Sequence, residues 1–336
     1  MEDLAFIDHD FHKYTKSGDF LKRIFIQQYK VKHFYISKKL KFDDEIIKYD
    51  NFFCFQILPS ISFLMKIKSK NIMWAPMYDS MHYPYHFGKT IWDIVEYFNI
   101  KVLFFSKKLR KISNNNSITG LDLKFFKKTN KLTLGGGKKI KIFSWNRGGV
   151  IRGGVCPNRW QKLFNPKEID VVYSLGHTNN EIKNIRKISN KVINFKGEFI
   201  HKKKFLSLIK KSDVFICPRE KEGIGMAHAE AISYSKYLVA HNDATMNEYI
   251  TNKKIGYLLD KDKGPITSTY ILNNQNYRKK NAANGFNIYK LKEKKILKLF
   301  QKKIKFKYSF YKELIIKFKH ILLCLNWKIK YILDVK

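Results

Sequence analysis

The segment Val214–Ile250 constrains the fold of this chain more than any other part of its sequence. It opens with an apolar run, Val214–Cys217, which predicts a buried strand that ends before a proline. The loop Arg219–Gly225 contains two glycines, whereas the next residues, Met226–Ser235, contain neither glycine nor proline and favour a helix. A second apolar run, Tyr237–Ala240, predicts another strand. Strand, glycine-containing loop, helix and strand form the repeating unit of an open parallel α/β sheet.

The loop in this segment has the composition of a site for a phosphate and for hydroxyl groups. Gly223 and Gly225 let the backbone approach a ligand closely. The start of the predicted helix favours an anion, because its N–H groups and its dipole present positive charge there. Glu222 and Glu230 flank this position with carboxylates, which accept hydrogen bonds from paired hydroxyls. A nucleotide-sugar carries hydroxyls on both sides of a phosphate and therefore matches the pattern.

The spacing Glu222-x7-Glu230, the sequence Glu-Gly-Ile-Gly-Met and the later Asn247-Glu248-Tyr249 resemble the signature of retaining family-4 glycosyltransferases of the GT-B type. The resemblance extends over the second domain to about Asp260. It implies an α/β fold with two Rossmann-like domains that face a central cleft, followed by C-terminal helices. Without the resemblance, the same residues read as an amphipathic surface helix with solvated glutamates.

The resemblance also implies roles for the residues of this loop. Glu230 would bind the ribose of the donor, and Glu222 would bind the donor sugar. The loop Gly223–Gly225 would cover the sugar and the phosphate. No metal ion is expected at this site, because arginine can neutralise the charge of the phosphates, and no cofactor is expected beside the nucleotide-sugar substrate.

A glycine-rich window after the predicted strand Ile140–Ser144 gathers three arginines, Arg147, Arg152 and Arg159, although arginine is scarce in this chain. Arginine beside closely approaching backbone suits a diphosphate. In the family that the chain resembles, a pair of basic residues holds the donor's phosphates here. Arg147 matches the first of them. The second, a lysine, is missing, and Arg152 is the candidate substitute; a basic solvated loop is the competing interpretation.

The N-terminal part alternates apolar runs with helical segments, which predicts one Rossmann-like domain. Its first strand is expected at Leu4–Ile7, and ligands of such sheets bind at loops that follow strand ends. The next loop therefore offers candidate contacts to an acceptor, namely His9, His12 and Ser17, which read equally well as polar loop residues without a ligand.

In the family that the chain resembles, a polar residue of the first domain, often histidine, lies against the transferred sugar. His82, with Asp79 beside it, is the candidate for this position, and a structural role for either residue is an equal alternative. The expected catalytic residues are Glu222, Arg147 and His82, and the expected donor-binding residues are Glu230, Gly223, Ile224, Gly225, Arg152, Arg219 and Met226.

Composition shifts place the expected domain boundaries. The segment Asn130–Lys139, which is glycine-rich and then basic, reads as a linker. We therefore expect an acceptor domain over residues 1–134, a donor domain over residues 138–275, and basic helices over residues 276–336. In the last segment, lysine alternates with isoleucine, leucine, phenylalanine and tyrosine. Such helices either lie on an anionic membrane or pack back onto the first domain.

The net charge of +38 invites a nucleic-acid interpretation. Lysine, however, far outnumbers arginine and is accompanied by much asparagine, isoleucine, phenylalanine and tyrosine, the composition expected from an AT-rich genome. No zinc-finger spacing, RNA-binding aromatic motif or helix-turn-helix pattern is recognisable. An anionic membrane surface is therefore the preferred partner, and nucleic acid is not expected.

The sequence carries no recognisable targeting signal. The N-terminus lacks a basic start, the chain lacks an uninterrupted apolar run of about 18 residues, and its four cysteines form no CxxC motif. We expect neither a signal peptide nor a spanning helix. We expect a cytoplasmic enzyme that can lie peripherally on the inner face of the cell membrane.

The resemblance, together with these observations, implies a hexosyltransferase that moves a sugar from a nucleotide-sugar to a hydroxyl of a glycan or lipid-linked acceptor with retention, in cell-surface polysaccharide synthesis. The alternatives are a basic nucleic-acid-associated protein, and a sugar phosphorylase or nucleotide-sugar epimerase built on the same fold.

Overall fold

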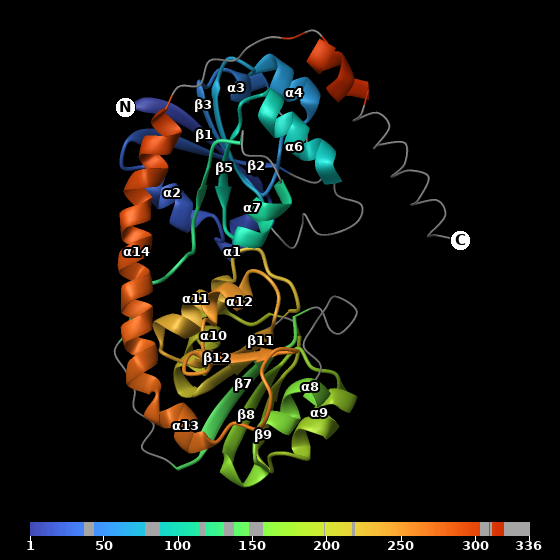
Figure 1. Ribbon diagram of the computed structural model, residues 1–336, viewed down its shortest axis with the longest axis vertical. Coiled ribbons are helices and arrows are strands. Elements are labelled where there is room, and N and C mark those ends of the chain that lie inside the picture. Colours follow the sequence, from blue (N-terminus) through green and yellow to red (C-terminus); the bar gives the residue numbers. More distant parts are fainter. Residues whose placement is uncertain are drawn as a thin grey trace, which may run out of the picture. The chain divides into compact units, whose positions relative to one another are not determined.

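The computed structural model describes residues 1–36, 44–77, 88–113, 118–130, 138–147, 157–197, 199–216, 219–302, 309 and 311–318. The chain divides into two units (Figure 1). Unit 1 consists of Met1–Leu123 and Leu291–Lys336, and unit 2 consists of Lys124–Lys290. Residues 131–137 of the expected linker Asn130–Lys139, including its three glycines, lie outside the described residues.

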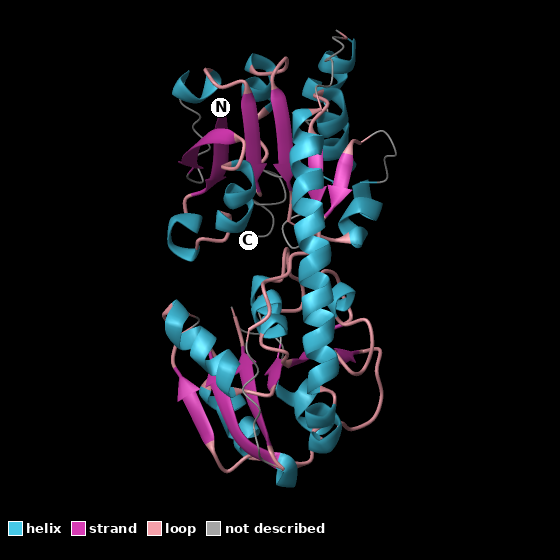
Figure 2. Cartoon of the chain, turned by 90° about the vertical axis from the view of Figure 1, so that its left-hand side faces the viewer, coloured by secondary structure: helices cyan, strands magenta, loops and turns pink. Residues whose placement is uncertain are grey.

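Unit 1 is a parallel sheet with helices packed on it (Figure 2). Its strands are β1 (Glu2–His9), β2 (Tyr29–Ile36), β3 (Asn51–Phe55), β4 (Asn71–Ala75), β5 (Lys101–Phe104) and β6 (Gly120–Asp122), in the spatial order β2-β1-β3-β4-β5-β6. All recorded pairings in this sheet are parallel. Its helices are α1 (His12–Thr15), α2 (Asp19–Phe25), α3 (Asp44–Ile47), α4 (Ile61–Lys66), α6 (Gly88–Tyr97) and α7 (Lys107–Ser113).

The central strands of this sheet form from apolar runs rather than from alternating patterns. Leu4–Ile7 of β1 and Phe52–Phe55 of β3 have no exposed side chain. A strand that is buried on both faces needs such a continuous run, because helices cover both sides of a parallel sheet. The predicted first strand, Leu4–Ile7, is therefore confirmed as the core of β1.

Unit 2 repeats this architecture. Its strands are β7 (Ile140–Trp145), β8 (Ile169–Leu175), β9 (Val192–Phe195), β10 (Val214–Ile216), β11 (Tyr237–His241) and β12 (Gly256–Leu259), in the order β12-β11-β10-β7-β8-β9. Its helices are α8 (Pro157–Trp160), α9 (Asn179–Arg186), α10 (Lys202–Lys211), α11 (Met226–Ser233), α12 (Met246–Tyr249) and α13 (Ser268–Asn273), with short 3-10 turns at Gln161–Leu163 and Pro166–Glu168. Two parallel six-stranded sheets with helices confirm the predicted pair of Rossmann-like units.

The predicted strand, loop, helix and strand of the segment Val214–Ile250 are all present, with shifted ends. Helix α11 ends at Ser233 instead of continuing to Ser235. Ser235 has a φ of 58°, a left-handed conformation that stops a helix. Strand β10 ends at Ile216, and Cys217 lies outside the described residues.

The long helix α14 (Gln275–Gln301) contributes residues to both units, because the boundary between them falls after Lys290. Its last turn belongs to unit 1, where the Phe300 ring lies 5.0 Å from the Phe25 ring and 5.3 Å from the Tyr29 ring, centroid to centroid. The Phe300 carbonyl accepts hydrogen bonds from Lys101 Nζ at 2.6 Å and from Asn71 Nδ2 at 2.9 Å. These donors satisfy a carbonyl that a helix end otherwise leaves unpaired. Among the described residues, none of the helices is both long and apolar enough to cross a bilayer.

A buried arginine ties the first part of α14 to its neighbours in unit 2. Arg278 donates from Nε to the Ser235 carbonyl at 2.8 Å, from Nη2 to the Ile271 carbonyl at 2.8 Å, and from Nη1 to the Lys254 carbonyl at 3.3 Å. Burial lowers the pKa of Arg278 to about 10, so the guanidinium stays charged at neutral pH. One side chain thus satisfies a carbonyl of helix α13 and carbonyls of the two segments that follow α11 and precede β12.

We expect Arg278→Met to lower the free energy of unfolding by about 3 kcal/mol or more, because buried carbonyls lose their charged donor. Urea denaturation followed by circular dichroism measures the change. The matched control is Lys279→Met, at the next position of the same helix, where the side chain is exposed. Equal unfolding midpoints for the two variants would contradict the structural role of Arg278.

Candidate functional site

The candidate site lies at the carboxyl edge of the unit 2 sheet, between β7 and β10. These strands are neighbours, and Ile216 of β10 is in register with Ser144 of β7. The strand order reverses at this pair, since the chain runs from β7 to one side of the sheet and returns from β10 to the other. Ligands of open parallel sheets bind outside the carboxyl ends of the strands at such a reversal. Arg147, which follows β7, and the loop 219–225, which follows β10, therefore meet at the expected position.

Hydrogen bonds from the segment that follows β11 hold the loop 219–225 in place. The hydroxyl of Thr245 lies 2.9 Å from the Glu222 carbonyl and 2.6 Å from the Gly223 carbonyl. The hydroxyl of Tyr249 lies 3.1 Å from the Ile224 carbonyl and 2.9 Å from the Phe125 carbonyl. This explains why Glu222, Gly223 and Ile224 are buried although they belong to a loop. The predicted cluster around Asn247-Glu248-Tyr249 thus supports the loop from the side of the protein core.

Gly225 shapes the junction between the loop and α11. It is the N-cap residue of that helix and has a φ of 70°, which favours glycine because other residues are strained there. Gly225 has no side chain that could cap α11, and no acidic residue lies in the first turn of the helix. The N-terminus of α11, which begins at Met226, therefore presents a positive end that suits an anion.

Glu230 projects from α11 and is almost completely buried, with 1% of its surface exposed. Its Oε1 accepts a hydrogen bond from Lys127 Nζ at 2.8 Å and a second, shorter one from Lys202 Nζ. Its Oε2 is enclosed and makes no hydrogen bond to a described residue. One oxygen is thus neutralised by two lysines, and the other keeps its lone pairs for a further donor.

Lys127 and Lys202 are functional candidates that the sequence alone did not reveal. Both are partly exposed, and both reach Glu230 from outside α11. Lys202 opens a run of three lysines at the start of α10, which has the pattern of a solvated basic face. Lys127 lies in the segment after β6, far from any recognised motif. Only the folded chain shows that the two ammonium groups share one carboxylate.

Arg147 stands at the carboxyl end of β7 and is half-buried. Its guanidinium lies 5.3 Å from the centre of the Phe199 ring, close enough for a cation–π interaction. Phe199 is itself half exposed. The ring restricts the arginine without using its hydrogen-bond donors, which remain suited to a phosphate.

A polar cluster fixes the neighbouring carboxyl end of β8. Ser144 Oγ lies 2.9 Å from His177 Nε2, and Asn146 Nδ2 donates to Glu181 Oε1 at 2.9 Å. Burial would raise the pKa of Glu181, but the neighbouring His177 ring, 3.7 Å away, and hydrogen bonds from Thr178 lower it to about 2, so the carboxylate stays ionised. These contacts hold the backbone that leads into Arg147.

His228, two residues before Glu230, is completely buried, and neither ring nitrogen has a partner among the described residues. Burial lowers the pKa of His228 to about 4, so the ring is neutral at physiological pH. It packs near the rings of Phe215 and Tyr249, with centroids 5.9 Å and 6.5 Å away. The imidazole of His228 is therefore a packing group in the core beside the loop 219–225.

Most of the predicted donor-site residues lie at the carboxyl edge of the unit 2 sheet. Glu222, Gly223, Ile224, Gly225, Met226 and Glu230 follow one another through the loop and α11, with Arg219 at the start of the loop and Arg147 on the adjacent strand end. His82, Asp79 and Arg152 lie outside the described residues. Among the described residues, no group of three or more His, Cys, Asp and Glu side chains is arranged to hold a metal ion.

Comparison with known proteins supports the same assignment for this part of the chain. Residues 176–285 match the family model for glycosyl transferases group 1, and this match includes the loop 219–225 and Glu230. A search of curated proteins gave no match.

Several solved structures share the fold at low sequence identity. A glycosyltransferase from Rickettsia africae is 13% identical, with 89% of this chain and 98% of that chain covered and a TM-score of 0.56. Anabaena HepE in complex with UDP is 12% identical, with 88% of this chain and 100% of the HepE chain covered and a TM-score of 0.51. A mutant of S. aureus TarM in complex with fondaparinux, alpha-GlcNAc-glycerol and UDP is 13% identical, with a TM-score of 0.50. That match covers 68% of this chain but only 50% of the TarM chain. The matched segment and the shared two-sheet architecture together support a glycosyltransferase with the GT-B fold.

Proposed function

We propose that this protein transfers a hexosyl residue from a nucleotide-sugar to a hydroxyl of a glycan or a lipid-linked acceptor, with retention at the anomeric carbon. The observation that carries the proposal is that Arg147, the start of α11 with its glycine N-cap, and the nearly buried Glu230 all belong to the elements at one strand-order reversal. The HepE structure with bound UDP, which shares the fold, supports a nucleotide-sugar as the ligand. Retention rests on the resemblance of the Glu222-x7-Glu230 spacing.

We base the proposed roles on the family resemblance, and the contacts of Glu230 support its part in them. Glu230 Oε2 accepts a hydrogen bond from a ribose hydroxyl, while Lys127 and Lys202 hold the other oxygen. Glu222 binds hydroxyls of the donor sugar. In the reaction, the bond between the anomeric carbon and the diphosphate oxygen breaks, and the electron pair leaves with the nucleoside diphosphate. The acceptor oxygen forms the new bond, and its proton passes to the departing diphosphate.

Stabilisation of the leaving group is electrostatic in this scheme. Arg147 and the backbone amides at the start of α11 face the charge that develops on the diphosphate. Such preorganised donors lower the barrier because they are already in place when the bond breaks. Loop residues Gly223–Gly225 cover the sugar and phosphate, with Arg219 and Met226 at their borders. We propose that these groups neutralise the diphosphate without a bound metal ion.

We place the enzyme in cell-surface polysaccharide synthesis and on an anionic membrane. Residues 311–318 are helical, and Tyr311, Leu314, Ile315 and Phe318 are all exposed. Their spacing puts them on one face of the helix. Lys312 and Lys317 are exposed beside them, and the whole chain carries a net charge of +38. An apolar face bordered by lysines suits a lipid surface with negative headgroups.

The reaction type is tested by a thermal-shift screen of nucleotide-sugars followed by product analysis. Glycosyl transfer yields free nucleoside diphosphate and a longer glycan. Sugar 1-phosphate would identify a phosphorylase, and an isomerised nucleotide-sugar would identify an epimerase. Steeply salt-dependent binding of DNA or RNA, without nucleotide-sugar binding, would replace the enzyme proposal by a nucleic-acid role.

We expect Glu230→Ala to weaken nucleotide binding by about 1.5–3 kcal/mol, because a charged hydrogen-bond acceptor is lost. Isothermal titration calorimetry with the free nucleotide measures the change. Glu220→Ala is the matched control, since Glu220 lies on the same loop and is exposed. Unchanged nucleotide affinity in Glu230→Ala would remove this residue from ribose binding.

We expect Arg147→Ala to reduce kcat by at least about tenfold while the melting temperature changes little, because the arginine acts on charge that is largest in the transition state. The control is Phe199→Leu, which removes the ring beneath the guanidinium but leaves the charge, and we expect it to have the smaller effect on kcat. Normal turnover in Arg147→Ala would reassign the leaving-group role to another cation, with Arg152 and Lys221 as the next candidates.

We expect a chain that ends at Lys302 to lose its affinity for anionic vesicles, because each lysine near such a surface contributes about 1 kcal/mol and the apolar face adds burial. The truncation keeps Phe300 and its contacts with Lys101 and Asn71. Co-sedimentation with phosphatidylglycerol vesicles at low and high salt, alongside circular dichroism, measures binding and folding.

Two outcomes would overturn the membrane role. A folded truncation that still binds vesicles equally well would show that the segment is not the anchor. An unfolded truncation would favour the alternative in which the C-terminal residues stabilise unit 1, a role consistent with the buried side chain of Ile316.

A further inference from the structure

Unit 1 has its own cluster of polar side chains at the carboxyl end of β1. The strand order of this sheet reverses between β1 and β3, which lie side by side. By the rule that places ligands in unit 2 at β7 and β10, this end of β1 is the expected ligand position in unit 1. The strand ends in Asp8 and His9, and the short helix α1 begins at His12.

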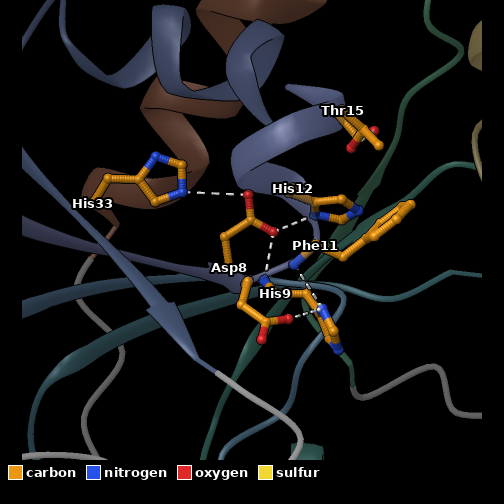
Figure 3. A network of polar contacts seen from close by, with 8 residues as sticks. Asp8, His9, Phe11, His12, Thr15 and His33 are labelled. Atoms are coloured by element: carbon orange, nitrogen blue, oxygen red, sulfur yellow. Dashed lines mark hydrogen bonds and ion pairs between the residues drawn. The ribbon is translucent and has the colours of Figure 1, made fainter.

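Asp8 is the centre of the cluster (Figure 3). Its carboxylate has no exposed surface. Oδ1 lies 2.5 Å from His12 Nδ1 and accepts a hydrogen bond from the His9 backbone at 2.7 Å, while Oδ2 lies 3.2 Å from His33 Nε2. The backbone of Gly18 approaches Asp8 closely: a Cβ atom at residue 18 would lie 2.7 Å from Asp8 Oδ2, so there is no room for a side chain there. The carboxylate is thus fully enclosed by hydrogen-bond donors and backbone.

These contacts keep Asp8 ionised. Burial alone would raise the pKa of Asp8, but the hydrogen bonds from His12 and His33 lower it below its usual value. An ionised carboxylate only accepts hydrogen bonds, so the nitrogens that face it carry hydrogen. His12 therefore donates from Nδ1 and His33 donates from Nε2.

The two histidines differ in what surrounds the rest of the ring. His33 stacks on Tyr35 at a centroid distance of 4.0 Å and meets the edge of Phe6 at 4.7 Å, so its ring is part of the packing. In His12, the second nitrogen, Nε2, points away from Asp8 (Figure 3), and the structure records no hydrogen bond from it to a described residue. With Nδ1 bound to Asp8, Nε2 is the ring nitrogen of His12 that is left to form a hydrogen bond with a ligand.

Aromatic side chains border His12. The centre of the Phe55 ring lies 5.2 Å from that of His12, and the centre of the half-exposed Phe11 ring lies 6.2 Å away. The exposed hydroxyl of Thr15 lies on the same short helix. An imidazole nitrogen that can form a hydrogen bond, beside an apolar ring, matches a sugar, which has hydroxyls at its edge and C–H groups on its faces.

We propose that His12 Nε2 binds a hydroxyl of the sugar acceptor and that Asp8 acts as its positioning residue by fixing the ring tautomer. The inference rests on the proposed glycosyl transfer, for which it names the acceptor-binding group of unit 1. Asp8 needs no contact with the ligand in this arrangement, because its hydrogen bond to Nδ1 orients the ring. A purely structural pair, in which His12 only anchors α1 to β1, is the competing explanation.

Two variants separate these explanations. In His12→Asn, the side-chain amide still donates to Asp8, but the group at the position of Nε2 is gone. In His33→Phe, the ring still packs against Phe6 and Tyr35, but Asp8 loses one donor. If His12 binds the ligand, His12→Asn is defective in sugar binding. If its role is only structural, His33→Phe lowers the stability more than His12→Asn does, and sugar binding is unchanged in both variants.

The experiment uses the full chain and the p-nitrophenyl α- and β-glucosides and galactosides as probes, with binding followed by ligand-detected NMR. We expect at least one probe to bind the unaltered chain and to bind His12→Asn about tenfold more weakly, as the loss of one well-placed hydrogen bond predicts. We expect His33→Phe to keep the affinity of the unaltered chain while its melting temperature falls. In transfer assays with the same probe, His12→Asn should raise the acceptor KM more than it lowers kcat.

Two results would overturn the assignment: no probe binds the unaltered chain, or His12→Asn binds the probe as tightly as the unaltered chain does. UDP affinity, measured by calorimetry in parallel, is expected to be the same in all three proteins, because unit 2 is untouched. Hexoside binding that depends on His12 in a chain that binds no nucleotide or nucleotide-sugar would refute the proposed transfer reaction and leave the sugar site in place.

Discussion

The order of the parallel strands decides where a ligand can meet this chain. In both sheets the strand order reverses once, between β1 and β3 in unit 1 and between β7 and β10 in unit 2. At a reversal the two connecting segments turn to opposite sides, so the carboxyl ends of the strands are left uncovered. The chemically distinctive residues lie at these positions: Asp8 and His12 in one unit, Arg147 and the loop before α11 in the other.

Local patterns in the sequence predicted the architecture and the loop, because both depend on residues that are close in the chain. The apolar runs that became β1, β10 and β11, and the glycine in left-handed conformation before α11, are of this kind. The two Rossmann-like units of the GT-B fold are confirmed, while the catalytic roles of Glu222, Glu230 and Arg147 remain predictions. The partners of Glu230 were not predictable, since Lys127 and Lys202 come from separate segments and one of them is 103 residues away. The hydrogen bond between His33 and Asp8 likewise joins neighbouring strands that no local pattern connects.

The lysine excess has a second use that composition alone does not reveal. Lys101 donates to the end of α14, Lys236 donates to the Lys210 carbonyl in the last turn of α10 at 2.9 Å, and Lys124 reaches the Glu248 carbonyl in α12. Burial lowers the pKa of Lys101 and of Lys236 to about 8. Cations at these positions satisfy unpaired carbonyls and oppose the negative end of the helix dipole. Part of the positive charge therefore serves the fold, which weakens the inference from net charge to a nucleic-acid partner.

The return of α14 to unit 1 affects the order in which the chain can fold during synthesis. Unit 2 is continuous in sequence, so every residue that it needs is available once Lys290 has been made. Unit 1 begins earlier but lacks Phe300, a buried ring that packs on Phe25 and Tyr29, until the last turn of α14 leaves the ribosome. Domains generally fold as units while they are synthesised. Unit 2 is thus the first unit to be complete, whereas unit 1, whose six strands are made earlier, must wait with part of its core uncovered for residues that are made after unit 2.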